Sequence, residues 1–153
     1  MWFAKTHLVP TSELTQDQRL LAAPAWQLHD RENAVREFAM GDASIDLSEF
    51  TDSEARFIDI YGTVRKFRPE FRPEHILGID PEGLVITDGE GRGFWDTFVS
   101  TYWLTKPATP RRPERHIVWT LTWHFTPDKE WILVGSHATA AETQAASRSS
   151  IVR

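Results

Sequence analysis

Three long segments in the C-terminal half alternate apolar and polar residues, and this alternation constrains the fold more than any other feature of the chain. The segments are Phe94–Leu104, Arg115–Phe125 and Trp131–Thr139. A period of two is typical of strands that bury one face. The turn at Thr126–Lys129 and the proline-rich stretch Lys106–Glu114 separate the segments, since neither can continue a strand. We therefore expect an antiparallel meander with one buried face.

The N-terminal part has a helical pattern instead, over residues 11–41. Its apolar stripe is formed by Leu28, Val35, Phe38 and Ala39, and its polar side is assigned to Arg31, Glu32, Arg36 and Glu37. Pro24 predicts a break into two helices, and Gly41 predicts the end of the second. Helices followed by a run of strands predict an α+β fold, with N-terminal helices packed on a strongly curved antiparallel β-sheet.

Between these parts the sequence predicts shorter elements. We expect a short strand at Phe57–Tyr61, strands at Ile76–Ile79 and Leu84–Thr87 around a turn, and a glycine-rich turn at 88–93. A tandem repeat, FRPEFRPE, occupies residues 67–74. The repeat is interpreted either as a connector anchored by its two phenylalanines or as a basic recognition loop with four cations, Arg65, Lys66, Arg68 and Arg72.

Length and composition limit the class of protein. A chain of 153 residues predicts a single domain, over residues 1–139, with a flexible tail over 140–153. Because the chain has no cysteine, it can form neither disulfides nor thiolate metal sites. A net charge of -5 argues against a nucleic-acid partner, and no apolar run is long enough to span a membrane. The N-terminal residues lack the pattern of a signal peptide, so we expect a cytoplasmic protein.

Alternation assigns each strand residue to one of two faces, if Leu104 lies opposite Arg115 and Thr122 opposite Leu133. The apolar face holds Phe94, Asp96, Phe98, Ser100, Tyr102, Leu104, Ile117, Trp119, Leu121, Trp123, Phe125, Ile132, Val134 and Ser136. The chain contains seven tryptophans, which indicates either a thick aromatic core or an aromatic-lined cavity. For a cavity, the predicted pocket residues are Phe98, Ser100, Trp119, Leu121, Trp123 and Ser136.

Two polar residues on the apolar face are the candidate catalytic groups. A buried Asp96 would have a raised pKa and could act as a general acid or base. Tyr102 could donate a hydrogen bond to a developing oxyanion. The alternatives are a carboxylate at the rim of the sheet for Asp96 and an ordinary core tyrosine for Tyr102.

The other face is rich in threonine yet too apolar for plain solvent. It holds Trp95, Thr97, Val99, Thr101, Trp103, His116, Val118, Thr120, Thr122, His124, Trp131, Leu133 and His137. Large exposed apolar patches are uncommon on monomers, so this face predicts a homodimer interface. Its histidines offer no set of three ligands, so we expect no metal site, and no sequence motif for an organic cofactor is present.

The C-terminal half resembles the NTF2-like superfamily, which includes SnoaL-like cyclases and ketosteroid-isomerase-like proteins. The resemblance rests on residues 98–104, 120–125 and 130–139, the last with a tryptophan after an acidic turn and a late His137-Ala138-Thr139. It implies a cone-shaped α+β barrel with helices inside a curved sheet, an apolar pocket at the wide end and frequent dimers through the outer face. Asp96 and Tyr102 resemble the family's acid–base chemistry in type, and the FRPEFRPE stretch departs from a region that is usually helical.

Residues 76–83 also resemble the opening hairpin of a PAS sensory domain. Two functions therefore stay open. One is an NTF2-like protein that binds a small apolar or polyketide-like molecule, as a cofactor-independent lyase, isomerase or hydrolase with carboxylate acid–base chemistry. The other is a non-catalytic ligand-sensing or dimerisation module, either PAS-like or an accessory subunit.

Overall fold

A long helix and six strands, with two short helices between them, make up the part of the chain that the structure describes. The computed structural model describes residues 16–141, with side chains from residue 25 onward. Helix α2 (Gln16–Ala39) precedes the 3-10 helix η2 (Leu47–Glu49), strand β1 (Thr51–Ile58), strand β2 (Val64–Lys66) and helix α3 (Pro73–Leu77). The chain then forms β3 (Val85–Phe94), β4 (Thr97–Lys106), β5 (Arg115–Phe125) and β6 (Trp131–Ala140).

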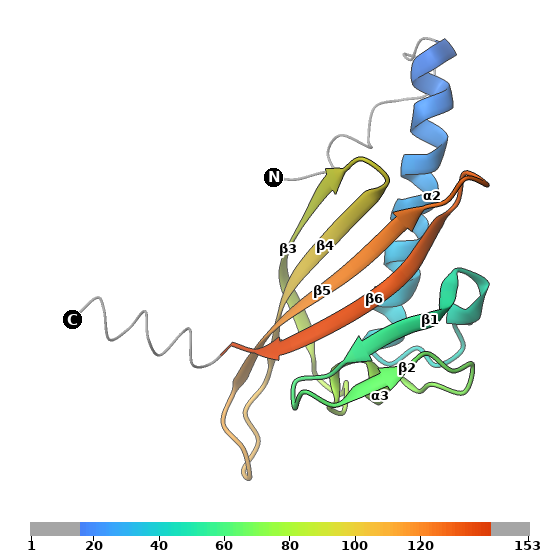
Figure 1. Ribbon diagram of the computed structural model, residues 1–153. Coiled ribbons are helices and arrows are strands. Elements are labelled where there is room, and N and C mark those ends of the chain that lie inside the picture. The colour runs from blue at the N-terminus through green and yellow to red at the C-terminus, as the bar shows by residue number, and fades with distance from the viewer. Residues whose placement is uncertain (1–15, 142–153) are drawn as a thin grey trace.

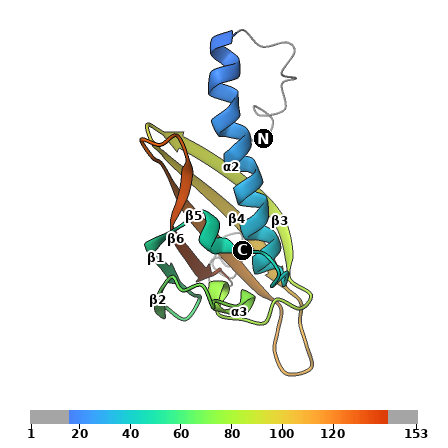
Figure 2. The ribbon, with the colours of Figure 1, turned by 90° about the vertical axis from the view of Figure 1, so that its right-hand side faces the viewer.

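The six strands form one curved, unclosed sheet in the order β2-β1-β6-β5-β4-β3. Helix α2 runs along the concave side of this sheet, and α3 lies at the same end as β1 and β2 (Figures 1 and 2). The predicted α+β fold, with a helix on a strongly curved sheet, is confirmed. The sheet is not wholly antiparallel, however, because β1 pairs parallel to β6.

The meander has a different register from the predicted one. Leu104 lies opposite Ile117, two residues from the predicted partner, and a shift of two keeps every side chain on its face. Between β5 and β6 a bulge leaves Val134 without a partner, because Thr122 pairs with Gly135 while Trp123 pairs with Leu133. Leu133 is therefore fully buried and Trp131 packs against the core, so the outer face predicted for these two residues is wrong.

Two further predictions, a helix break at Pro24 and a strand at 76–79, are also wrong. Helix α2 continues past Pro24, since a proline inside a helix removes one backbone hydrogen bond and need not end it. The predicted strand at 76–79 is not formed, because residues 76 and 77 end helix α3 and residues 78 and 79 are in no strand. Pro73 occupies the first turn of that helix, and Gly78 ends it with a left-handed φ of 86°.

The glycine-rich stretch at 88–93 is part of strand β3 and not a turn. Gly89, Gly91 and Gly93 lie directly opposite Tyr102, Ser100 and Phe98 of β4. A Cβ atom on Gly89 would lie 2.9 Å from Cδ1 of Tyr102, so the tyrosine ring occupies the space that a side chain would need. Glycine is required there for packing, not for a turn.

The core fills the space between the concave face of the sheet and the helices. Its largest side chains are Tyr102, Trp119 and Trp123 from the meander, against Leu28, Val35 and Phe38 from α2. The repeat acts as a connector with two anchors, because the rings of Phe67 and Phe71 lie 5.9 and 5.2 Å from that of Phe57.

The predicted tail starts at residue 140, and nearly all of it (142–153) lies outside the described residues. Within residues 16–141, no helix has both the length and the apolar character to cross a membrane.

Candidate functional site

The concave face of the meander brings together the side chains that the sequence predicts for a pocket. All six are buried on strands β4, β5 and β6: Phe98, Ser100, Trp119, Leu121, Trp123 and Ser136. The indole Nε1 of Trp119 donates a hydrogen bond of 2.9 Å to Oγ of Ser136. Their contact with a ligand stays a prediction.

The structure separates the two predicted catalytic residues. Tyr102 is fully buried on the concave face. Asp96 lies in the two-residue turn between β3 and β4, where its side chain is 62% exposed and lies 3.6 Å from Nδ1 of His124. The predicted burial of Asp96 is wrong, because the hairpin tip extends past the core; the rim alternative describes its position, and the adjacent Phe94 is exposed for the same reason.

The buried carboxyl group of this fold belongs to Glu32 of α2, which the sequence interpretation placed on the polar side. Glu32 is 1% exposed. It lies four residues after Leu28 and three before Val35, so it shares their stripe toward the sheet. That spacing is the signal that could have identified it: an acidic residue in the middle of an apolar stripe.

Two hydroxyl groups of β4 bind one oxygen of this carboxyl group. Tyr102 donates a hydrogen bond of 2.8 Å from its hydroxyl to Oε2 of Glu32, and Ser100 donates a second, short one from Oγ to the same atom. The guanidinium carbon of Arg36 lies 5.4 Å from the centre of the Tyr102 ring, a cation–π distance. A helix residue and two strand residues 68 and 70 positions away thus form one polar cluster inside an apolar core.

Burial dominates the protonation of this cluster. It raises the pKa of Glu32 from 4.5 to about 7, although the hydrogen bonds from Ser100 and Tyr102 and the charge of Arg36 act in the opposite direction. Burial, followed by the nearby Glu32 charge, also raises the pKa of Tyr102 above its ordinary value. Near neutral pH, Glu32 therefore exchanges a proton readily while Tyr102 stays a hydrogen-bond donor.

Several polar atoms of the same interior have no protein partner within the described residues. They include Oε1 of Glu32 and the indole nitrogens of Trp123 and Trp131. A buried polar group without a partner is costly, and such groups in native proteins usually serve a site or hold a water molecule. The free oxygen of Glu32 can accept a hydrogen bond when ionised and can donate one when protonated.

Comparison with known proteins gives a fold. No protein-family model and no curated protein matches the chain. A candidate ketosteroid isomerase from Shewanella frigidimarina is 20% identical with a TM-score of 0.54, over 71% of this chain and 94% of that one. The S. rosetta CaMKII hub is 15% identical with a TM-score of 0.56, over 75% and 95%. An NTF2-like protein of unknown function from Rhodospirillum rubrum is 18% identical with a TM-score of 0.51, over 74% and 97%. The chain has the NTF2-like fold.

The comparison supports the NTF2-like resemblance, and not the PAS-like one, for the fold. The expected opening hairpin of a PAS domain is absent, since residues 73–77 form α3. Within the NTF2-like fold, α3 begins at Pro73, inside the second FRPE unit, close to where the resemblance implies a helix. Glu32 faces the concave side of the sheet from α2.

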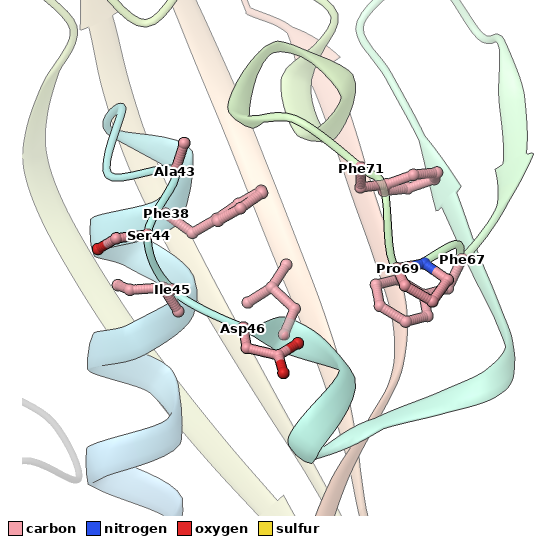
Figure 3. A pocket seen from close by; sticks show the side chains of 9 residues that line it. Phe38, Ala43, Ser44, Ile45, Asp46, Phe67, Pro69 and Phe71 are labelled. Carbon is pink, nitrogen blue, oxygen red and sulfur yellow. The ribbon is translucent and has the colours of Figure 1, made fainter.

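A separate hollow of about 240 Å³ lies at the C-terminal end of α2 (Figure 3). The end of the helix, the following loop and the FRPEFRPE connector enclose it, with Phe38, Phe67 and Phe71 among its walls. Its carboxylate, Asp46, is already bonded to the backbone and hydroxyl of Ser48. None of the predicted pocket residues lines this hollow, and it has no free polar group comparable to Glu32.

Metal ligands are not grouped in residues 16–141, where no three His, Asp or Glu side chains come together. His116 and His124 each lie beside one acidic residue, Glu114 and Asp96, near opposite ends of β5. Besides Glu32, the buried charged side chains among the described residues are Asp59, which is paired with Arg65, and Lys106, which donates to the backbone carbonyls of Asp80 and Glu82.

Proposed function

We propose that the protein binds a small, largely apolar molecule between α2 and the concave sheet, and that Glu32 transfers a proton to or from it. The observation that carries this proposal is the buried carboxyl group of Glu32, with one oxygen held by Tyr102 and Ser100 and the other free. A ligand with a single carbonyl or hydroxyl group would satisfy the free oxygen, while the aromatic walls would take its apolar part.

The pKa of Glu32 supports general acid–base chemistry as the reaction class. A general base with a pKa near 7 is half ionised at neutral pH and serves equally well as base and acid. The ionised carboxylate would take a proton from the carbon next to a ligand carbonyl and would later return it to another carbon atom. This is an isomerisation without net oxidation, and the name of the Shewanella relative supports that class.

Tyr102 has a different role from the predicted one in this proposal. Its hydroxyl is committed to Glu32, so it acts as a positioning residue that favours the ionised carboxylate. Because Glu32 is 1% exposed, a ligand must displace packing between α2 and the sheet to reach it. Its binding rate should therefore level off at high ligand concentration, as for other complexes that require a conformational change.

Proton exchange into a simple ketone tests the proposal directly. 2-Tetralone is bicyclic and apolar and has exchangeable protons beside its carbonyl, and NMR in D₂O follows their replacement. We expect the full chain to accelerate this exchange and Glu32→Gln to reduce the acceleration at least 100-fold, the usual contribution of a general base. Asp96→Asn is the matched control, because its carboxyl lies outside the core, and it should leave the rate unchanged. Equal rates for wild type and Glu32→Gln would contradict the proposed function.

The convex face supports a second proposal, self-association. Along β4 and β5 this face presents half-buried Trp103 and Val99 among threonines, and Trp95 at the hairpin tip is 88% exposed. We propose that it forms a homodimer interface, in line with the hub and association domains among the structural relatives. Sedimentation velocity should show a dimer that Trp103→Glu dissociates; a wild-type monomer at all concentrations would contradict the interface.

The alternative function is a non-catalytic ligand-sensing or dimerisation module, for which the half-buried Trp103 and the exposed Trp95 at the hairpin tip are the supporting observation. Dimer formation without ketone exchange would favour it. We also propose a cytoplasmic location, because the chain lacks cysteine.

A further inference from the structure

Strand β2 is an edge of the sheet, and part of its backbone points away from the protein. Asp59 donates its backbone N–H to the carbonyl of Thr63, and Phe67 donates to the carbonyl of Ala55. Backbone groups in an antiparallel pair alternate in direction, so odd-numbered residues of β2 face β1. The N–H and C=O groups of Val64 and Lys66 therefore face the open edge, as a template for one further strand.

A hollow of about 400 Å³ lies along this edge. Its walls come from β2, the FRPEFRPE connector and α3: Val64, Arg65, Lys66, Arg68, Glu70, Phe71 and His75. A second hollow of about 530 Å³ shares Arg65 and His75 with it and continues past Tyr61. Val64 is 52% exposed and Tyr61 is 62% exposed, so the trench offers apolar contacts along its length.

The charges of the first hollow favour an acidic occupant. Residues 64–72 carry four cations and one acid in a chain whose net charge is -5. Lys66 is paired with the exposed Glu54 and Arg65 with the buried Asp59, whereas Arg68 makes no ion pair with any other described residue. Cations on a short edge strand oppose the addition of a basic or uncharged strand, and an acidic strand would offset their charge. The second hollow contains Glu74 and Asp80, so the acidic part of an occupant would pass Lys66 and Arg68.

We propose that β2 is a docking edge on which an extended, acidic peptide segment of a partner protein adds a strand to the sheet. The outward-facing backbone favours a peptide over a nucleic acid, because a nucleic acid has no peptide backbone that could pair with it. The chain's own terminal segments lack the required charge, since residues 1–15 contain one Lys and one Glu, and residues 142–153 contain one Glu and two Arg. The two hollows share no residue with the Glu32 cluster, and the proposal does not depend on the proposed function.

Fluorescence anisotropy with the full chain tests the docking edge. The probe is a fluorescein-labelled decapeptide of alternating Glu and Val, compared with a Lys–Val decapeptide and with a Glu–Val decapeptide methylated on alternate backbone nitrogens. We expect only the unmodified acidic peptide to bind, and its affinity to fall as salt rises. Methylation blocks strand pairing while it keeps every side chain, so the methylated peptide separates pairing from simple charge attraction.

Two variants locate the site. Val64→Pro removes an outward N–H that β1 does not use, and should weaken binding about fivefold, the effect of one hydrogen bond. Arg68→Glu should weaken it by at least as much, whereas Arg92→Glu makes the same charge change on β3, at the other edge of the sheet, and should have no effect. If Val64→Pro unfolds the protein, the comparison of Arg68→Glu with Arg92→Glu still shows whether the peptide binds at this edge.

Three results would overturn the proposal: no binding at millimolar peptide, equal binding of the methylated peptide, or equal loss in Arg68→Glu and Arg92→Glu. Tighter binding of a labelled oligouridine than of the acidic peptide would assign the cations to nucleic acid instead.

Discussion

Glu32 is a carboxyl group held away from water, so its protonation is coupled to folding. Its pKa of about 7 in the folded protein lies above the ordinary 4.5, and the folded state therefore binds this proton more tightly than the unfolded state does. The contribution to stability is complete below about pH 4.5 and is lost as the pH rises to about 7. Above that pH the folded protein holds a buried charge.

Glu32→Gln should remove this pH dependence, because glutamine carries no charge at any pH. Between pH 4.5 and 7.5 the wild type should lose about 3 kcal/mol of unfolding free energy that the variant keeps. Urea unfolding of both proteins across this range measures the difference. Parallel curves would show that Glu32 ionises normally, and would contradict the burial that the site depends on.

Tyr102→Phe removes a hydrogen bond that the ionised form of Glu32 accepts. The pKa of Glu32 should therefore rise further, by about one unit, since a hydrogen bond to a charged group is worth about 1.5–3 kcal/mol and part of it remains with the neutral acid. Ser100→Ala should shift the pKa in the same direction. An unchanged or lower pKa in Tyr102→Phe would mean that the tyrosine does not hold the carboxylate.

Strand β3 contributes to stability through its alternate glycines, because they leave room for the aromatic rings of β4. Gly89→Ala would place Cβ 2.9 Å from the Tyr102 ring, and should destabilise the protein by about 1–3 kcal/mol, the usual cost of overpacking. Gly135→Ala is the matched control, since its Cβ would meet only a backbone oxygen at 3.9 Å. Urea midpoints measure both, and equal midpoints would show that Tyr102 can move at little cost.

The sequence predicted the elements with strong periodicity and missed those set by tertiary contacts. Alternation alone placed Ser100, Tyr102, Trp119 and Trp123 on one buried face, as found. The bulge at Val134 depends on how two strands fit together and leaves no local signal. Glycines usually indicate turns, so the role of Gly89 beside Tyr102 became visible only with both strands in place.

The sequence predicts the residues of the candidate site that lie on strand β4, but not the one that lies on helix α2. Tyr102 and Ser100 follow from the period of β4, whereas Glu32 comes from a helix 68 residues earlier in the chain. A glutamate usually faces solvent, and the helix stripe had enough apolar residues without it. Alternation predicts a buried Asp96 only if it continues through the hairpin tip, and the core ends before that tip.

For the whole molecule, self-association should make stability depend on concentration. If the convex face pairs two copies, the Tm of the wild type should rise as protein concentration rises, because a dimer is stabilised by mass action. Trp103→Glu should remove this dependence. A wild-type Tm that stays constant over a hundredfold range of concentration would argue for a monomer.

The proposed proton transfer needs a carboxyl group poised near neutrality between α2 and the sheet, and the pKa of Glu32 can be measured directly. Protein labelled with ¹³C at the glutamate side-chain carboxyl carbon, titrated by NMR from pH 4 to 9 beside Glu32→Gln, identifies the Glu32 resonance. We predict a single buried resonance with a midpoint of about 7, absent from the variant. A Glu32 midpoint close to the ordinary 4.5 would show that burial does not raise its pKa, and would contradict the proposed proton transfer.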